Sequence, residues 1–187
     1  MYQTTITDRE AGQRLDKYLH RILPNAGNGF LYKMLRKKNI TLNDQKADGS
    51  EKIAAGDRVK IFFAPETLAR FMGRDPSEKQ QAAPDVAPLL PEFMSAYSKL
   101  SGIRILYEND HILIADKPAG VLSQKAEKTD LSLNEWLIGY LLQKEPSLAA
   151  ELPTFRPSVC NRLDRNTCGL VIGAKTLRGG QYMNELL

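Results

Sequence analysis

The chain has 187 residues, 42% of them hydrophobic, which is enough to build the core of one or two domains. The formal net charge of +4 is uneven, because residues 1–65 carry twelve Lys or Arg against seven Asp or Glu, whereas residues 66–187 carry fourteen against fifteen. Two cysteines and two histidines give no zinc spacing and no disulfide framework, and no signal-type N-terminus or long apolar run occurs, so we expect a cytoplasmic protein without a metal site or membrane span.

The first third of the chain has the pattern of a compact α+β module. Residues 13–23 and 30–38 carry apolar side chains at helical spacing, and Pro24 with the following Gly- and Asn-rich residues separates the two predicted helices. Residues 40–42 and 58–63 predict strands, the first of them ending in a turn at Asn43 and Asp44.

Residues 65–100 change in character and predict a Pro-rich linker, with a short helix near 91–100. A linker of this length favours separate domains on its two sides. The prolines are Pro65, Pro76, Pro84, Pro88 and Pro91.

The last part of the chain, residues 101–187, regains regular patterns. Residues 103–107 and 112–116 predict two strands, and residues 131–142 predict an amphipathic helix. Residues 159–174 predict a turn that leads into a buried strand. Lys117 follows the second strand, where a lysine either faces a phosphate or is simply solvated.

Six cations of the two N-terminal helices are expected to share a surface that contacts RNA phosphates. With Asn43 and the Gly56-Asp57 turn, the ordered pattern resembles the alpha-L RNA-binding domain over about the first 62 residues. The alternative is a small basic domain that binds a protein or nothing, and Asp16 is expected to be a structural salt-bridge or capping residue. The cations are Arg14, Lys17, Lys33, Arg36, Lys37 and Lys38.

A carboxylate between two arginines, Asp164 between Arg162 and Arg165, is the clearest candidate for chemistry. Taken alone, such a residue is most often ion-paired or a cap. The arginines favour its ionised form, which makes it a poor general acid but allows it to act as a nucleophile or base beside a cationic rim that holds phosphates.

Two segments resemble the RluA-type pseudouridine synthase family. They are ILYENDHILIADKPAGVLSQ, which is similar to its opening motif, and RLDRNTCGL at 162–170, which is similar to its catalytic motif. The resemblance implies that Asp164 acts in breaking the glycosidic bond of a flipped-out uridine, so that the uracil rejoins the ribose through carbon five. It also implies that Arg165 fills the vacated base stack or holds a phosphate, and that no cofactor is needed.

The chain departs from the family pattern in three ways. Asn161 stands where many members have His, and Cys168 stands where Ser is common. The family's catalytic domain continues to a stacking Tyr and a later motif, and Tyr182 lies too early for that role. We therefore expect an incomplete catalytic domain: a truncated chain, one completed by another chain, or an inactive fragment.

These observations predict an α+β protein with an alpha-L RNA-binding domain at 1–64, a linker at 65–100 and the start of a mixed-sheet synthase domain at 101–187. The predicted activity is isomerisation of uridine to pseudouridine in structured RNA, with ribosomal RNA as the expected partner. Asp164 is the predicted catalytic residue, supported by Arg162 and Arg165. Two alternatives are a non-catalytic RNA-binding or ribosome-associated protein, and a cysteine hydrolase that uses Cys160 or Cys168.

Overall fold

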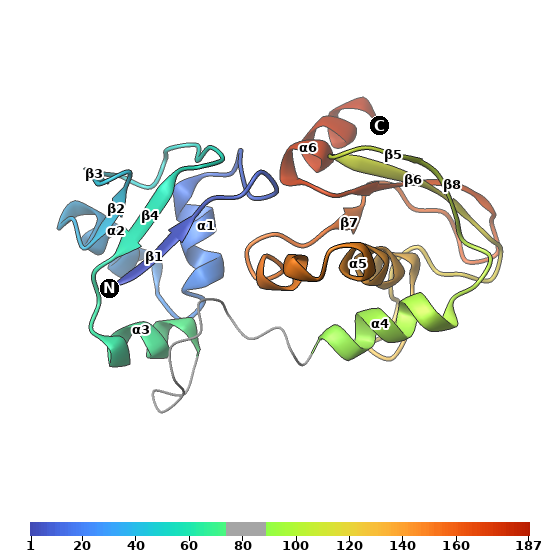
Figure 1. The fold of residues 1–187 in the computed structure, drawn as a ribbon, viewed down its shortest axis with the longest axis horizontal. Coiled ribbons are helices and arrows are strands. Elements are labelled where there is room, and N and C mark those ends of the chain that lie inside the picture. The colour runs from blue at the N-terminus through green and yellow to red at the C-terminus, as the bar shows by residue number, and fades with distance from the viewer. Residues whose placement is uncertain (74–88) are drawn as a thin grey trace. The chain divides into compact units, whose positions relative to one another are not determined.

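The computed structural model describes residues 1–73 and 89–187, which form two compact units (Figure 1). The first unit spans Met1–Pro84 and the second Asp85–Leu187. Each unit has its own hydrophobic core, and each is described here by itself. The α+β class predicted for the chain is confirmed, because both units combine helices with a four-stranded sheet.

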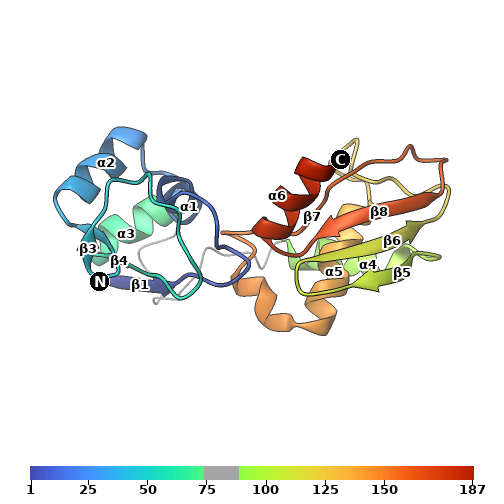
Figure 2. The same cartoon turned by 90° about the horizontal axis from the view of Figure 1, so that it is seen from above.

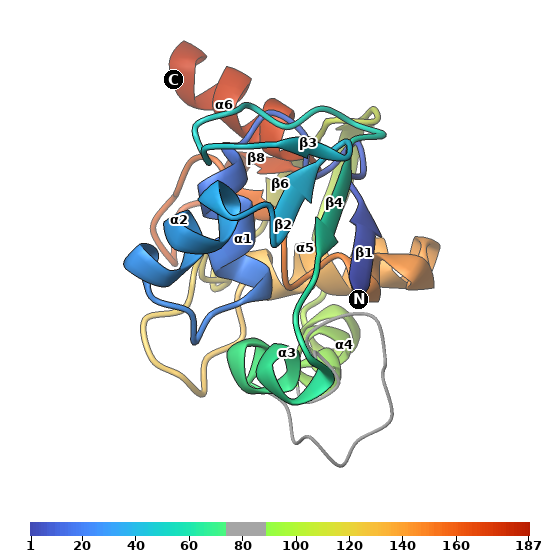
Figure 3. The same cartoon turned by 90° about the vertical axis from the view of Figure 1, so that its left-hand side faces the viewer.

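The N-terminal unit is an antiparallel sheet covered by short helices. Its strands lie in the order β1-β4-β2-β3 (Figure 3). The elements are β1 (Tyr2–Thr5), α1 (Leu15–Ile22), α2 (Asn28–Arg36), β2 (Ile40–Leu42), β3 (Gln45–Lys46), β4 (Arg58–Ile61) and α3 (Pro65–Met72).

Helical spacing explains which side chains of α1 and α2 are buried. Leu15, Leu19 and Ile22 follow one another at intervals of four and three residues, so they share the face of α1 that packs on the core. Leu31 and Leu35 do the same on α2. The opposite faces carry the cations, as the sequence pattern predicted.

The turn between β2 and β3 has the backbone that a two-residue hairpin requires. Asn43 and Asp44 both have positive φ, 50° and 64°, a conformation that Asn and Asp tolerate better than most residues. The Asn43 side chain also donates to Asp57 (2.8 Å) and accepts from the Arg58 amide (2.8 Å). This residue therefore ties the hairpin to the start of β4.

The segment predicted as a linker contains a helix at each end. α3 packs on the N-terminal core, where the rings of Phe71 and Phe30 lie 4.4 Å apart, and Gly73 with φ 72° ends the helix. α4 (Leu90–Lys99) packs on the C-terminal unit. The short helix predicted near 91–100 is thus confirmed as α4, whereas α3 was missed because Pro65 occupies a first-turn position, which helices accept. The centre of the predicted linker, 74–88, lies outside the described residues.

The C-terminal unit is built on a second antiparallel sheet, with strand order β5-β6-β8-β7 (Figure 2). Every ladder between its described strands is antiparallel, so the mixed sheet predicted from the sequence is corrected for this part of the chain. After α4, the elements are β5 (Arg104–Glu108), β6 (Ile112–Lys117), α5 (Leu133–Lys144), a 3-10 turn (Pro146–Ala150), β7 (Ser158–Val159), β8 (Gly169–Ala174) and α6 (Leu177–Leu186).

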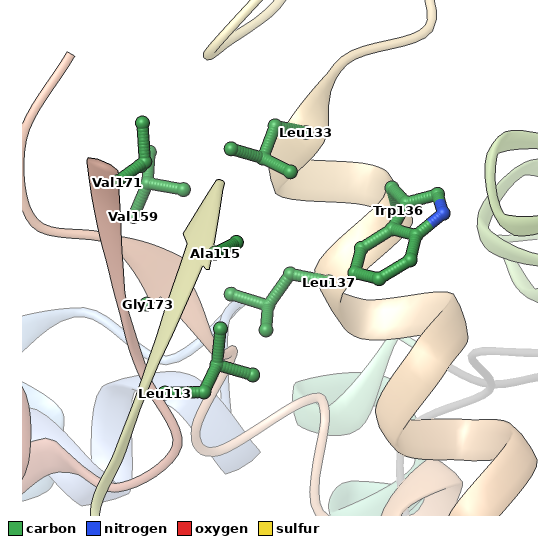
Figure 4. Close-up of a pocket in the computed structure, with 8 residues that line it drawn as sticks. All are labelled: Leu113, Ala115, Leu133, Trp136, Leu137, Val159, Val171 and Gly173. Carbon is green, nitrogen blue, oxygen red and sulfur yellow. The ribbon is translucent and has the colours of Figure 1, made fainter. Parts of the chain in front are cut away.

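Helix α5 covers one face of this sheet, and α4 packs on the outer side of α5 (Figure 1). Figure 4 shows Leu137 pointing from α5 toward β6 and β8, where Leu113 and Gly173 meet it. A Cβ on Gly139 would lie 2.3 Å from the Phe93 carbonyl oxygen, so glycine allows α4 to approach α5 this closely. This interior is apolar and offers no reactive group.

Candidate active site

Two loops lie at the same end of two neighbouring strands, one after β6 and one before β8. The turn after β6 begins at Lys117, and the loop before β8 ends at Gly169, and these residues are paired in the antiparallel ladder. The sequence motifs that contain Lys117 and Asp164 are therefore brought side by side by the pairing of β6 with β8. We call residues 160–168 the Asp164 loop.

Lys117 is fully buried and joins the two loops. Its Nζ donates to the carbonyl oxygens of Val121 (2.8 Å), Pro118 (3.2 Å) and Arg165 (3.2 Å). Burial lowers the pKa of this ammonium group, while the nearby Cys168 and Asp164 side chains act in the opposite direction. Both interpretations considered for Lys117, a phosphate ligand or a solvated residue, are wrong for this structure, because no part of the side chain reaches solvent.

Four further hydrogen bonds hold the turn and the Asp164 loop together. The Gly120 amide donates to the Arg165 carbonyl oxygen (2.8 Å), and Arg165 Nε donates back to the Gly120 carbonyl oxygen (3.2 Å). Ser123 Oγ contacts both backbone polar groups of Leu163, accepting from the amide (3.0 Å) and donating to the carbonyl oxygen (2.7 Å). The backbone on each side of Asp164 is therefore fixed.

Asn161 fixes the start of the loop to β8. Its Oδ1 accepts from the Ile172 amide (2.8 Å), and its Nδ2 donates to the Leu170 carbonyl oxygen (3.1 Å). The side-chain amide thus continues the hydrogen bonding of the sheet beyond the last residue of β7. Asn161 is one of the departures from the family pattern, and its side-chain amide joins the loop to β8.

Asp164 itself is exposed at the head of a turn closed by a hydrogen bond from the Thr167 amide to the Asp164 carbonyl oxygen (3.1 Å). Within residues 1–73 and 89–187, neither Arg162 nor Arg165 forms an ion pair with its carboxylate, and no group donates a hydrogen bond to it. The ion-paired or capping role that such a residue most often has is thus not what the structure shows. A carboxylate on a rigid backbone, open to solvent, can act as nucleophile or base.

Residues 111–187, which contain both loops, match the family model for RNA pseudouridylate synthase. This part of the chain is therefore similar to that family. The chain is also 29% identical over 186 residues to ribosomal large subunit pseudouridine synthase D of Xanthomonas campestris, covering 99% of this chain and 46% of that protein. It is 30% identical over 162 residues to ribosomal large subunit pseudouridine synthase C of Rickettsia felis, covering 87% and 46%. The chain therefore spans about half the length of these relatives, and the resemblance to RluA-type synthases is confirmed.

The synthase segment gives no support to a cysteine hydrolase. Cys160 is half-buried, and burial raises the pKa of its thiol, which disfavours the reactive thiolate. Cys168 is exposed in the Asp164 loop. His111, the histidine of this unit, precedes β6 and contacts Thr176 Oγ1 (3.2 Å), at the opposite end of the β6–β8 ladder from the Asp164 loop.

Six of the cations predicted to bind RNA belong to the N-terminal unit, whereas Arg162 and Arg165 belong to the Asp164 loop of the C-terminal unit. Arg14 forms a two-point ion pair with Asp16, Nε to Oδ1 (3.1 Å) and Nη2 to Oδ2 (2.8 Å), and Tyr32 donates to the same carboxylate (3.0 Å). The structural role expected for Asp16 is thus observed. The other five are exposed, namely Lys17, Lys33, Arg36, Lys37 and Lys38.

Sequence patterns missed the residues that support the synthase loops. Ser123 and Lys117 are 3% and 0% exposed; Lys117 is the last residue of β6, and Ser123 lies in the irregular turn that follows it. Periodicity identifies buried apolar side chains, whereas burial of a single Ser or Lys depends on contacts made by distant residues. The available signal was the resemblance of both motifs to one family, and that resemblance did not predict these hydrogen bonds.

Proposed function

We propose that this protein isomerises specific uridines to pseudouridine in structured RNA, with Asp164 as the catalytic carboxylate. The observation that carries the proposal is the Asp164 carboxylate itself, exposed and unpaired on a backbone held by Lys117, Ser123 and Asn161 within a synthase-family segment. The names of the relatives, ribosomal large subunit pseudouridine synthases C and D, make ribosomal RNA the proposed partner and the cytoplasm the proposed location.

The reaction breaks the bond between N1 of uracil and C1′ of ribose and forms a bond between C5 and C1′. The proton on C5 is lost and N1 gains one, so the atoms and electrons balance without a redox cofactor. Asp164 would attack the ribose, attack the ring or assist elimination, and each of these roles requires a carboxylate close to the base. Extruding the base from its stack costs about a few kcal/mol, which contacts to the RNA backbone must offset.

Two sets of exposed cations are suited to make these contacts with the RNA backbone. Arg162 and Arg165 flank Asp164 and are exposed, so they would hold phosphates or fill the vacated stack. In the N-terminal unit, Lys33, Arg36 and Lys37 recur at helical spacing and would bind the phosphate backbone. We propose accordingly that residues 1–64 are an alpha-L RNA-binding domain and that residues 101–187 form part of the catalytic domain.

The test is release of tritium from RNA labelled at C5 of uridine, because the proton on C5 leaves only when the isomerisation proceeds. The substrate is a transcript of large-subunit ribosomal RNA. Two proteins are compared: this chain, and this chain extended by the part of the Xanthomonas relative that lies beyond the match. We expect release by the extended protein and none after Asp164→Asn.

RNA binding is measured on the same proteins as a function of salt concentration. Replacing Lys33, Arg36, Lys37 and Lys38 together by Ala should reduce the slope of log affinity against log salt by about 3, since each phosphate contact contributes about 0.7–0.9. Tight, salt-dependent binding with no tritium release by a folded extended protein would overturn the enzyme proposal in favour of a non-catalytic RNA-binding protein.

A further inference from the structure

We propose that Ser123 is a positioning residue for Asp164, an inference that rests on the function proposed above. Ser123 Oγ lies 3.0 Å from the amide nitrogen and 2.7 Å from the carbonyl oxygen of Leu163, the residue immediately before Asp164. One hydroxyl group thus satisfies both backbone polar groups of a single loop residue. Ser123 is 3% exposed, so water does not compete for these bonds.

The geometry acts directly on Asp164 because the Leu163 carbonyl belongs to the peptide plane that also contains the Asp164 nitrogen. Holding that oxygen fixes the plane from which the Asp164 side chain projects. The Leu163 side chain is anchored independently, since it packs on the core of the C-terminal unit. Leu163 is therefore held by its side chain and by both of its backbone groups, and Asp164 is held as a consequence.

Ser123 is itself fixed by helix α5. Its carbonyl oxygen accepts from the Asn134 amide (3.2 Å) in the first turn of the helix, and the preceding residue, Leu122, accepts from the Leu133 amide (2.8 Å). Asn134 also accepts a bond from the Val159 amide (3.0 Å) at the end of β7. A continuous set of hydrogen bonds therefore leads from the start of α5 through Ser123 to the Asp164 loop.

A hydroxyl is needed at this position because it donates and accepts at once. Alanine would leave the Leu163 amide and carbonyl without their partner, whereas threonine keeps the hydroxyl. The expected consequence is a loop that samples several positions, so that Asp164 is misplaced in most of them. Misplacement of a reacting group by about 1 Å can cost on the order of 100-fold in rate.

The test compares Ser123→Ala and Ser123→Thr with Thr176→Val. Thr176 is equally buried, and its hydroxyl caps α6 beyond the far end of β8, so this variant is a matched loss of a buried hydroxyl away from the Asp164 loop. The first readout is exchange of the Leu163 amide hydrogen, followed by NMR on this chain. We expect exchange to rise roughly tenfold in Ser123→Ala, and to stay near the wild-type value in Ser123→Thr and Thr176→Val.

The second readout is tritium release by the extended protein. Ser123→Ala should lower kcat by roughly 10- to 100-fold with little change in KM, and Ser123→Thr should restore most of it. An unchanged kcat in Ser123→Ala, with Asp164→Asn inactive, would overturn the positioning role and leave the proposed function intact. Absence of release from every protein would instead refute the proposed function. In that case a protected Leu163 amide in Ser123→Ala would overturn the positioning role as well, and loss of that protection would support it.

Discussion

The sequence Arg-Leu-Asp followed by a cation occurs twice, at residues 14–17 and 162–165, and the two copies have opposite surroundings. In the first, Asp16 lies at the start of α1 and accepts from Arg14 and Tyr32. In the second, Asp164 lies in a loop and is exposed. Four similar residues thus produce a structural carboxylate in one unit and a candidate reactive one in the other.

The backbone explains the difference. Arg14 is extended, with φ −74° and ψ 146°, at the point where α1 begins, and its guanidinium group reaches the carboxylate two residues later. In the loop, Arg162 is the counterpart of Arg14 but forms no ion pair with Asp164 within the described residues, and Arg165 donates to the Gly120 carbonyl oxygen (3.2 Å). A motif of charged residues therefore specifies chemistry only together with the backbone that directs each side chain.

The largest expected effect follows from exchanging the two carboxylates for amides. Asp164→Asn should abolish tritium release by the extended protein while leaving the urea midpoint unchanged, because the side chain is exposed. Asp16→Asn should do the reverse. It should retain the release rate and destabilise the N-terminal unit by about 1 kcal/mol, since it weakens the hydrogen bonds that tie α1 to Tyr32 of α2. Full activity in Asp164→Asn would contradict the role assigned to the second copy.

The next effect concerns the residue that holds the second copy in place. Lys117→Met should destabilise the C-terminal unit by about 2 kcal/mol, because three carbonyl oxygens lose their shared donor. Urea unfolding followed by Trp136 fluorescence measures this loss, since the indole lies in the same core. Lys99→Met, at an exposed position of α4, is the control and should change the midpoint little. Equal midpoints for the two variants would show that Lys117 does not hold the loops together.

A third carboxylate, Glu108, extends the comparison because it is paired like Asp16. Burial acts against ionisation, but hydrogen bonds from Lys144, Lys175 and Tyr140 hold the pKa of Glu108 at about 2, below its ordinary value of 4.5. A lowered pKa in the folded state stabilises the protein above pH 4.5, and this contribution is lost as the pH falls toward 2. The urea midpoint of Glu108→Gln should therefore fall less over that range than the wild-type midpoint. Parallel curves would show that the ion pairs are not kept in solution.

The sequence predicted the apolar framework better than the polar one. Leu15, Leu19 and Ile22 were assigned to the core from their spacing, and each is at most 1% exposed. Phe71 was missed because α3 is short and begins at a proline, so a linker was the simpler interpretation. The antiparallel sheet was missed because strand direction depends on how β6 and β8 meet, and their sequences do not record it.

The sequence predicted the motif residues of the candidate site but not the contacts that support them. The family resemblance identified Asp164 as the candidate catalytic residue, whereas the structure shows that its loop lies beside the turn at Lys117. The sequence also separated the structural carboxylate of the first copy, Asp16, from the candidate reactive one of the second, but it did not predict the contacts that hold the Asp164 loop, because these come from residues far along the chain. Ser123 lies 40 residues from Leu163 in sequence, and only the fold brings the two together.

The smallest expected effect separates the paired cation of the first copy from its unpaired neighbours. Arg14 is ion-paired with Asp16, whereas Lys37 is exposed at the end of α2. Lys37→Ala should reduce the salt slope of RNA binding by about 0.7–0.9, and Arg14→Ala should reduce it by less than half of that, because a carboxylate already neutralises the guanidinium group. Asp16→Asn provides the matched test, since it releases Arg14 and should tighten RNA binding slightly at low salt. Equal slopes for Arg14→Ala and Lys37→Ala would mean that Arg14 leaves Asp16 for a phosphate when RNA binds. The first copy would then be a binding element as well as a structural one.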